Sequence, residues 1–320
     1  MYNNAKASHL FDCKQVVIMK KIVIAGAGHM GLSASKLLDP NRIEFLGFAD
    51  NDPSKWTLPD GGCPGTAGMD AAARAAEKPP VFSVQTAVDL APDEFIISAI
   101  DKERSRAIEE QLKVCRFYGN IMKLHELYED FDIRSRCLKE LAGRIGHVSG
   151  AVAELGVYQG DTAWQINAFL PDRQFYLFDT FEGFTETDVA TEKAYVLSGA
   201  AVGEFSDTTV GSVLERMPHP ENCHIRKGHF PETAAGLAHA EFAFVSLDAD
   251  LYEPTKAGIE FFYPRLNKGG IMIIHDYNNT RFKGVNQAVK EYERALVESG
   301  GAPLKLVPLG DLHGSCVIVK

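Results

Sequence analysis

The fold of this chain is decided by residues 153–162, which read AELGVYQGDT. The apolar residues 151–155 predict a β-strand, and residues 161–169 have the spacing of a helix. Between them, Gly156 and Gly160 predict a tight turn that lets the backbone approach a ligand closely. The helix that follows would offer free N–H groups at its N-terminus. This stretch therefore predicts the first strand–turn–helix unit of a parallel α/β sheet.

An acid at the end of the next predicted strand strengthens the case for a ligand at this turn. The strand 174–178 ends at Asp179, 23 residues after Gly156, where a carboxylate can accept both hydroxyls of a ribose. A glycine turn alone fits a ligand-free turn equally well. The glycines and the acid together favour a nucleoside-binding site.

Acidic residues also follow two later strands. The stretch 245–255, VSLDADLYEPT, places Asp248 and Asp250 after a buried strand, and 273–278, IIHDYN, places His275 and Asp276 after the next. Carboxyl ends of parallel strands share one sheet edge, so these side chains would converge there. An oxygen-rich cluster suits Mg²⁺, which would acidify a substrate hydroxyl whose proton a neighbouring carboxylate could take. The alternative is that these acids cap helices, as Asp250 could do ahead of Pro254.

The remaining elements of the second half complete a recognisable layout. Strands at 242–247 and 271–274, helices from 253 and over 284–297, and a terminal hairpin of 304–308 with 315–320 follow the two strands above. Four predicted parallel strands and a terminal antiparallel hairpin match the layout expected of a class I methyltransferase, a Rossmann-like α/β fold with five parallel strands and such a hairpin. Residues 184–229 are predicted to be long and irregular, and we interpret them as a lid over the ligands. The stretch 231–233 fits a helix start equally well.

Five motifs occur in the order found in the macrocin O-methyltransferase-like (TylF/MycF type) family, which residues 150–320 resemble. They are ELGVYQG (154–160), FDTFEGF (178–184), GHFPET (228–233), DADLYEPT (248–255) and HDY (275–277). The resemblance implies an enzyme that methylates a sugar hydroxyl with S-adenosylmethionine (SAM) and Mg²⁺, on a small-molecule saccharide acceptor.

The resemblance also implies roles for individual residues. Asp250 falls on the position of the general base, and the metal ligands would be Asp248, His275 and Asp276. The implied SAM-binding residues are Glu154, Gly156, Tyr158, Gly160, Thr162, Asp179, Thr180 and Asp248. The best-known members carry an aspartate where this chain has His275, and histidine is a less natural Mg²⁺ ligand. His275 could ligate the metal, bind a metal-bound water, or suit a different metal.

The first half carries a second glycine motif. After the strand KIVIA (21–25), the glycines Gly26, Gly28 and Gly31, followed by Asp50, fit the dinucleotide-binding fingerprint. A strand at 43–49, a loop at 52–68, a helix at 71–77, strands at 81–84 and 94–100 and a helix at 104–118 complete a small Rossmann-like parallel sheet. A complete dinucleotide fold needs two such halves, and no motif here positions a hydride-transfer residue.

Three interpretations of the first half stay open. GFADNDPSKW (47–56) resembles small Rossmann-like N-terminal domains fused to sugar-modifying enzymes, which implies a binding or docking module for NAD or a nucleotide-sugar. The unit could instead be a structural or dimerising domain, or an NAD(P)-dependent oxidoreductase. For the whole chain, a non-catalytic nucleotide-binding assembly factor is a further alternative, against which the intact acids at 248, 250 and 276 argue.

Length and composition set the outer limits. The 320 residues predict an N-terminal extension (1–20), a Rossmann-like domain (21–125), a helical connector (126–146) and a methyltransferase domain (147–320). A hydrophobic share of 45% and a charged share of 24% exclude a disordered chain. The formal charge of −10 argues against nucleic acid or an anionic membrane as partner. The oligomeric state is open, with a homo-oligomer as one alternative.

Cysteine usage and the N-terminal residues indicate the compartment. Six isolated cysteines predict reduced thiols in a cytoplasmic protein: Cys13, Cys63, Cys115, Cys137, Cys223 and Cys316. No apolar run approaches the ~20 residues of a membrane span, and residues 1–18 lack a signal-peptide pattern. Translation could start at Met1 or at Met19, directly before the first strand.

Overall fold

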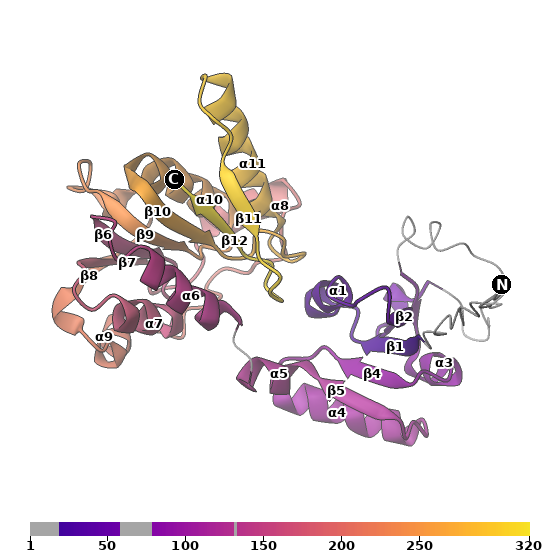
Figure 1. Cartoon of the computed structure of the whole chain (residues 1–320). Coiled ribbons are helices and arrows are strands. Elements are labelled where there is room, and N and C mark those ends of the chain that lie inside the picture. Colours follow the sequence, from indigo (N-terminus) through magenta and orange to yellow (C-terminus); the bar gives the residue numbers. More distant parts are fainter. Residues whose placement is uncertain (1–18, 58–78, 131–132) are drawn as a thin grey trace, which may run out of the picture. The chain divides into compact units, whose positions relative to one another are not determined.

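A computed structural model of the chain describes residues 19–57, 79–130 and 133–320 (Figure 1). The residues expected to form the start of an N-terminal extension, most of the loop at 52–68, the helix at 71–77, and Cys13 and Cys63 lie outside these ranges. The described residues form two compact units, one from residues 19–27 and 38–125 and the other from residues 28–37 and 126–320.

The first unit is built on a five-stranded sheet with the order β3-β2-β1-β4-β5, in which every neighbouring pair is parallel. Its strands are β1 (Lys20–Ala25), β2 (Ile43–Ala49), β3 (Val81–Phe82), β4 (Glu94–Ile97) and β5 (Asn120–Lys123). Its connections carry a 3₁₀ turn η1 (Pro53–Lys55), α3 (Val84–Asp89) and α4 (Lys102–Val114). Helix α1 (His29–Ser35), which follows β1 in the chain, and most of α5 (Leu124–Asp130), which follows β5, belong to the second unit. The predicted parallel sheet is therefore present, with an additional edge strand, β5.

Two predicted strands of this unit are shorter than expected: the strand at 81–84 because a helix begins early, and the strand at 94–100 because it ends at Ile97. Ser83 caps α3, its hydroxyl accepting a hydrogen bond from the Thr86 N–H, so the strand predicted at 81–84 ends at Phe82. Asp101 caps α4 in the same way through the Arg104 N–H, and α4 ends at Val114 rather than at 118.

An ion-pair cluster on α4 gives the first unit an acid-sensitive contact. The ammonium groups of Lys113 and Lys123 lie 2.7 and 2.8 Å from the carboxylate oxygens of Glu109. Their hydrogen bonds lower the pKa of Glu109 from 4.5 to about 2. Because this pKa is lower in the folded protein, the contact stabilises above pH ~4.5 and its contribution disappears as the pH falls toward 2.

We expect Glu109→Gln to flatten this part of the stability–pH curve, with a change of less than about 1 kcal/mol because the charges are partly solvated. Urea titrations between pH 2 and 5 would measure it. The chain has two tryptophans, so a Trp164→Phe background leaves Trp56 as the fluorescent reporter of the first unit. Glu110→Gln, at an exposed neighbouring position, should keep the parent curve; equal flattening in both variants would contradict the assignment to Glu109.

The second unit contains a seven-stranded sheet with the order β11-β12-β10-β9-β6-β7-β8. Its strands are β6 (Ala151–Leu155), β7 (Phe175–Asp179), β8 (Cys223–Lys227), β9 (Phe242–Leu247), β10 (Leu266–Ile274), β11 (Lys305–Pro308) and β12 (Cys316–Val319). The five strands from β8 to β10 are parallel, and β12 is antiparallel to both β10 and β11. The predicted class I methyltransferase fold, with five parallel strands and a terminal hairpin, is confirmed.

Helices cover both faces of this sheet (Figure 1). They are α6 (Ile133–Arg144), α7 (Asp161–Phe169), α8 (Glu186–Ala194), α9 (Val210–Arg216), α10 (Tyr252–Arg265) and α11 (Lys283–Glu298), with 3₁₀ turns η2 (Pro220–Asn222) and η3 (Glu232–Ala234). Along β10, Met272 and Ile274 enter one core while Ile271 and Ile273 enter the other. This burial on both faces explains why the central strands are continuous apolar runs.

Two expectations about this unit need correction or refinement. The stretch 184–229 was predicted to be irregular, and this prediction is wrong. It contains the helices α8 and α9 and the edge strand β8. The sequence of β8, CHIRK, is largely polar because this strand pairs only with β7 at the sheet edge, so it lacks an apolar pattern. Helix α6, in the segment expected to be a connector, packs Leu138 and Ala142 into the second unit's core.

Two further observations concern membrane spans and cysteines in the described part of the chain. No helix within residues 19–57, 79–130 and 133–320 is long and apolar enough to cross a membrane. Four cysteines in these ranges are free thiols: Cys115, Cys137, Cys223 and Cys316.

Candidate active site

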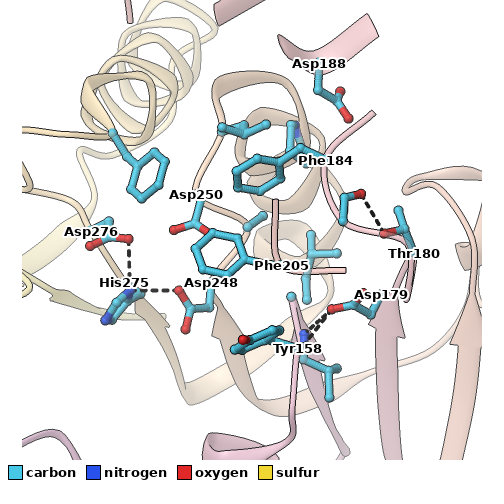
Figure 2. Close-up of a pocket in the computed structure, with 18 of the residues that line it drawn as sticks. Tyr158, Asp179, Thr180, Phe184, Asp188, Phe205, Asp248, Asp250, His275 and Asp276 are labelled. Carbon is cyan, nitrogen blue, oxygen red and sulfur yellow. Dashed lines mark hydrogen bonds and ion pairs between the residues drawn. The ribbon is translucent and has the colours of Figure 1, made fainter. Parts of the chain in front are cut away.

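A cavity of about 400 Å³ opens at the carboxyl ends of the parallel strands of the second unit. This is the edge at which open α/β sheets bind ligands. Its walls come from the segments that follow β6, β7, β9 and β10, and from residues of the stretch 184–229 (Figure 2). A volume of this size falls in the range of small-molecule sites.

The turn after β6 requires glycine for a reason internal to the chain. Gly156 has φ +87°, and a Cβ at this position would overlap the carbonyl oxygen of Asp248. The Gly156 N–H donates to the Phe178 carbonyl, and the Asp248 N–H donates to the Leu155 carbonyl. The glycine therefore lets the ends of β6 and β9 lie against each other, which brings Asp248 beside the turn.

Asp179 organises this turn through its carboxylate. One oxygen accepts hydrogen bonds from the N–H groups of Val157 (2.7 Å) and Tyr158 (2.8 Å), and the other accepts one from Phe181 (2.6 Å). A carboxylate offers about four acceptor positions, so room remains for a ligand hydroxyl. Next to it, the Thr180 hydroxyl donates to the Gly183 carbonyl at 2.9 Å.

Aromatic side chains form the apolar part of the wall. The ring of Phe205 packs edge-to-face against both Tyr158 and Phe184, with 5.3 Å between ring centroids in each pair. The Tyr158 hydroxyl donates to Asp207 at 2.8 Å, and the Gln159 side-chain amide donates to the same carboxylate at 3.0 Å. These contacts hold the segment around 205–208 against the turn after β6.

Three acids and a histidine converge on the opposite wall (Figure 2). Asp248 and Asp250 follow β9, and His275 and Asp276 follow β10. The His275 Nδ1 atom lies 2.8 Å from an Asp248 oxygen and 3.1 Å from an Asp276 oxygen. One ligand atom from each of the four side chains lies within 4.8 Å of the others. Asp250 and Asp276 both have φ +58°, an uncommon backbone conformation that occurs here at both strand ends.

Electrostatics in this cluster favour a bound cation. Burial, together with the charges of Asp276 and Asp248, raises the pKa of Asp250 well above its ordinary value. For Asp276, burial acts in the same direction, but the adjacent His275 outweighs it and lowers the pKa. Closely spaced carboxylates cannot all ionise without a compensating positive charge. The donor set, rich in carboxylate oxygens, therefore fits a divalent cation.

The motif at 228–233 contributes a separate polar group beside the cavity. The His229 Nε2 atom lies 3.2 Å from the buried Asp188, and its Nδ1 atom lies 3.3 Å from Glu232. Burial opposes protonation, but the two carboxylates prevail and raise the pKa of His229. Asp188 and His229 both line the cavity and are candidate contacts for a polar ligand.

The residues predicted to bind SAM fall into two groups. Six line the cavity: Gly156, Tyr158, Thr162, Asp179, Thr180 and Asp248. Glu154 is fully buried below it, accepting a hydrogen bond from the Ser246 hydroxyl. Gly160, with φ +83°, lies at the N-cap of α7 and faces Val213.

Sequence reasoning missed several residues of this cavity. Phe205 lies in a stretch without a regular pattern, so no periodicity pointed to it. His313 also lines the cavity, from the loop between β11 and β12.

The glycine motif that follows β1 has a different environment from the turn after β6. Gly26 has φ +107°, Gly28 is the N-cap of α1, and Gly31 is buried within that helix. Asp50 accepts hydrogen bonds from the Ala27 N–H (2.9 Å) and the Lys55 ammonium (3.0 Å). Burial opposes ionisation, but these and a further backbone hydrogen bond lower the pKa of Asp50. The chain's own donors thus engage the acid predicted to hold a ribose.

The sequence of this chain is similar to known O-methyltransferases. Residues 134–300 match the model of a family described as Macrocin-O-methyltransferase (TylF). Over 142 residues the chain is 30% identical to the 8-demethyl-8-(2,3-dimethoxy-alpha-L-rhamnosyl)-tetracenomycin-C 4'-O-methyltransferase of Streptomyces olivaceus. That match covers 41% of this chain and 54% of the relative, so the chain spans about half the length of this relative.

Similar solved structures include two methyltransferases. The calicheamicin methyltransferase CalS11 is 18% identical, with a TM-score of 0.47 over 79% of this chain and 94% of that one. The O-methyltransferase NovP is 18% identical, with a TM-score of 0.45 over 58% of this chain and 79% of that one.

Proposed function

Since the chain belongs to the macrocin-O-methyltransferase (TylF) family, we propose that it transfers a methyl group from SAM to a sugar hydroxyl with the help of a divalent cation. One observation carries the proposal: the glycine turn with Asp179 and the cluster of Asp248, Asp250, His275 and Asp276 face the same cavity. The name of the Streptomyces olivaceus relative, a 4'-O-methyltransferase of a rhamnosyl compound, supports a saccharide as the acceptor.

The turn after β6 would bind SAM. The free acceptor capacity of Asp179 suits the ribose hydroxyls, while the backbone at Gly156 and the side chains of Thr162 and Thr180 line the rest of this wall. When bound, SAM supplies a methyl group on a positively charged sulfur. The rings of Tyr158 and Phe205 would exclude water from this part of the cavity.

The acid cluster would orient and activate the acceptor. Asp248, Asp276 and His275 would hold the cation, for which Mg²⁺ is the choice predicted from sequence. A cation in this position lowers the pKa of a nearby hydroxyl. Asp250, in the same cluster, would accept the proton of the acceptor hydroxyl. Holding the acceptor in line with the methyl group would supply much of the rate enhancement.

The first unit would serve this activity as a binding or docking module. We propose that residues 21–125 form this module and that 126–146 join it to the methyltransferase domain at 147–320, with helix α6 packed into the core of that domain. A ligand such as NAD or a nucleotide-sugar would have to compete with the Ala27 and Lys55 donors for Asp50. Equilibrium dialysis of the full chain with NAD and with dTDP-rhamnose would test this module.

We expect Asp179→Ala to weaken binding of S-adenosylhomocysteine about 10- to 150-fold, as the loss of charge-assisted hydrogen bonds worth about 1.5–3 kcal/mol implies. Calorimetry with the purified full chain measures this affinity. Asp172→Ala, which removes an exposed acid of the same unit, should leave it unchanged.

The proposal as a whole is tested by transfer of a labelled methyl group from SAM to a panel of rhamnosyl glycosides. Binding of S-adenosylhomocysteine together with transfer to a sugar hydroxyl is the expected result. A chain that binds neither SAM nor S-adenosylhomocysteine would overturn it.

A further inference from the structure

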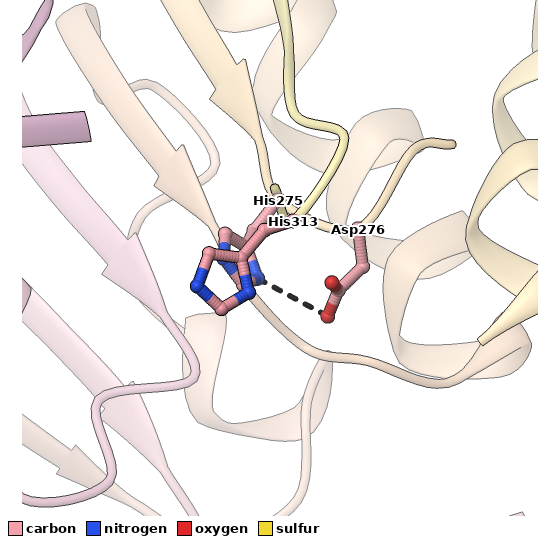
Figure 3. Close-up of side chains that lie close together, drawn as sticks. All are labelled: His275, Asp276 and His313. Atoms are coloured by element: carbon pink, nitrogen blue, oxygen red, sulfur yellow. Dashed lines mark ion pairs between the residues drawn. The ribbon is translucent and has the colours of Figure 1, made fainter. Parts of the chain in front are cut away.

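A second histidine lies at the acid cluster (Figure 3). The rings of His275 and His313 are 4.5 Å apart between centroids, with 39° between their planes. One ligand atom each from His275, Asp276 and His313 lies within 4.8 Å of the other two. His313 thus extends the cluster of Asp248, Asp250, His275 and Asp276 by a second imidazole.

Strand pairing explains why residues far apart in sequence meet here. β10 and β12 are antiparallel, and Ile274 pairs with Cys316. The residues directly after β10 therefore lie beside the residues directly before β12. His275 and Asp276 belong to the first group, and His313 belongs to the second.

The loop that carries His313 is fixed by buried contacts. The Asp311 carboxylate accepts hydrogen bonds from the N–H and the hydroxyl of Ser315, both at 2.7 Å, and both residues are buried. Gly314 has φ +72° and packs against Asn278, whose N–H donates to the Gly314 carbonyl at 2.7 Å. The loop is thereby tied to the segment that follows His275, which holds His313 at the cluster.

The donor set differs from that of a magnesium site. Mg²⁺ selects oxygen ligands and keeps several waters, whereas imidazole nitrogen suits first-row transition metals. We propose that His275, Asp276 and His313 bind a first-row transition-metal dication in preference to Mg²⁺. The proposal rests on the proposed function in one respect: it takes this cluster as the metal site of methyl transfer.

The second imidazole also leaves Asp250 free of metal binding. His275, Asp276 and His313 form a three-residue ligand set that does not need Asp250. Asp250 then remains available to accept the proton of the acceptor hydroxyl. An all-oxygen site would instead draw on Asp250 as a ligand.

The test measures metal affinity directly, without SAM or acceptor. The full chain, stripped with a chelator, is titrated with Co²⁺ and with Mg²⁺ by calorimetry, and the visible absorption of bound Co²⁺ reports its ligands. We expect His313→Gln to weaken Co²⁺ binding at least tenfold, since loss of even a supporting partner costs about 10–100-fold. Mg²⁺ binding should change much less, and the Co²⁺ spectrum should shift.

Matched variants separate ligation from general damage. His239→Gln, at an exposed histidine of the same unit, should change neither affinity nor spectrum. His313→Ala gives a second variant in which no side-chain amide can substitute as ligand, and S-adenosylhomocysteine binding checks that each variant is folded. An unchanged Co²⁺ affinity and spectrum in both His313 variants would overturn the proposal, as would equal losses for Co²⁺ and Mg²⁺. Because no methyl transfer is measured, a failure of the proposed activity would leave this result standing.

Discussion

Asp250→Asn is expected to lower kcat about 10²–10⁴-fold, the usual contribution of a positioned general base. Asparagine keeps the size and polarity of the side chain but cannot accept the proton of the acceptor hydroxyl. Asp250 shares one cluster with Asp248 and Asp276, and its carboxylate lies on the wall of the cavity. Initial rates with labelled SAM at saturating acceptor would measure the loss, and S-adenosylhomocysteine affinity should stay close to that of the parent.

Asp188→Asn provides a matched control, because Asp188 is a carboxylate on another part of the same cavity wall (Figure 2). Its loss of kcat should fall well below that of Asp250→Asn. If Asp250→Asn retained nearly full activity while Asp188→Asn lost it, the base would be the Asp188–His229 pair instead.

Gly156→Val is expected to destabilise the second unit by about 3 kcal/mol or more. A non-glycine residue at positive φ costs about 1–3 kcal/mol by itself. In addition, its Cβ would overlap the Asp248 carbonyl oxygen, a backbone atom that can move only if the ends of β6 and β9 separate. Urea unfolding followed by the fluorescence of Trp164, in a Trp56→Phe background, would report this unit.

Gly143→Ala is the control for this substitution. Gly143 lies in α6 of the same unit at an exposed position, and a Cβ there would meet nothing within 4 Å. Alanine at this position, in the last turn of the helix, should raise stability by up to about 0.5–1 kcal/mol. Opposite signs for the two variants are the expected outcome; a Gly156→Val variant as stable as the parent would show that the ends of β6 and β9 can separate at little cost.

The sequence predicted the second unit's fold and the edge where its polar residues gather because both depend on local patterns. Strand runs, glycine turns and the acids at 179, 248 and 276 lie within a few residues of strand ends, and parallel strands bring those ends to one edge. The strand β8 was missed because an edge strand can be polar, and the helices α8 and α9 because their apolar spacing is weak.

Tertiary structure decided which of these side chains lie next to one another in the site. The sequence could not place His313 beside His275, because that contact depends on the antiparallel register of β10 and β12. It also assigned Gly156 to ligand approach, whereas the fold requires glycine there to let β6 meet the Asp248 carbonyl. The sequence by itself determined which chemical groups stand at the ends of the strands. Only the three-dimensional pairing of distant strands decided their neighbours, because side chains separated along the chain meet only once the sheet is assembled.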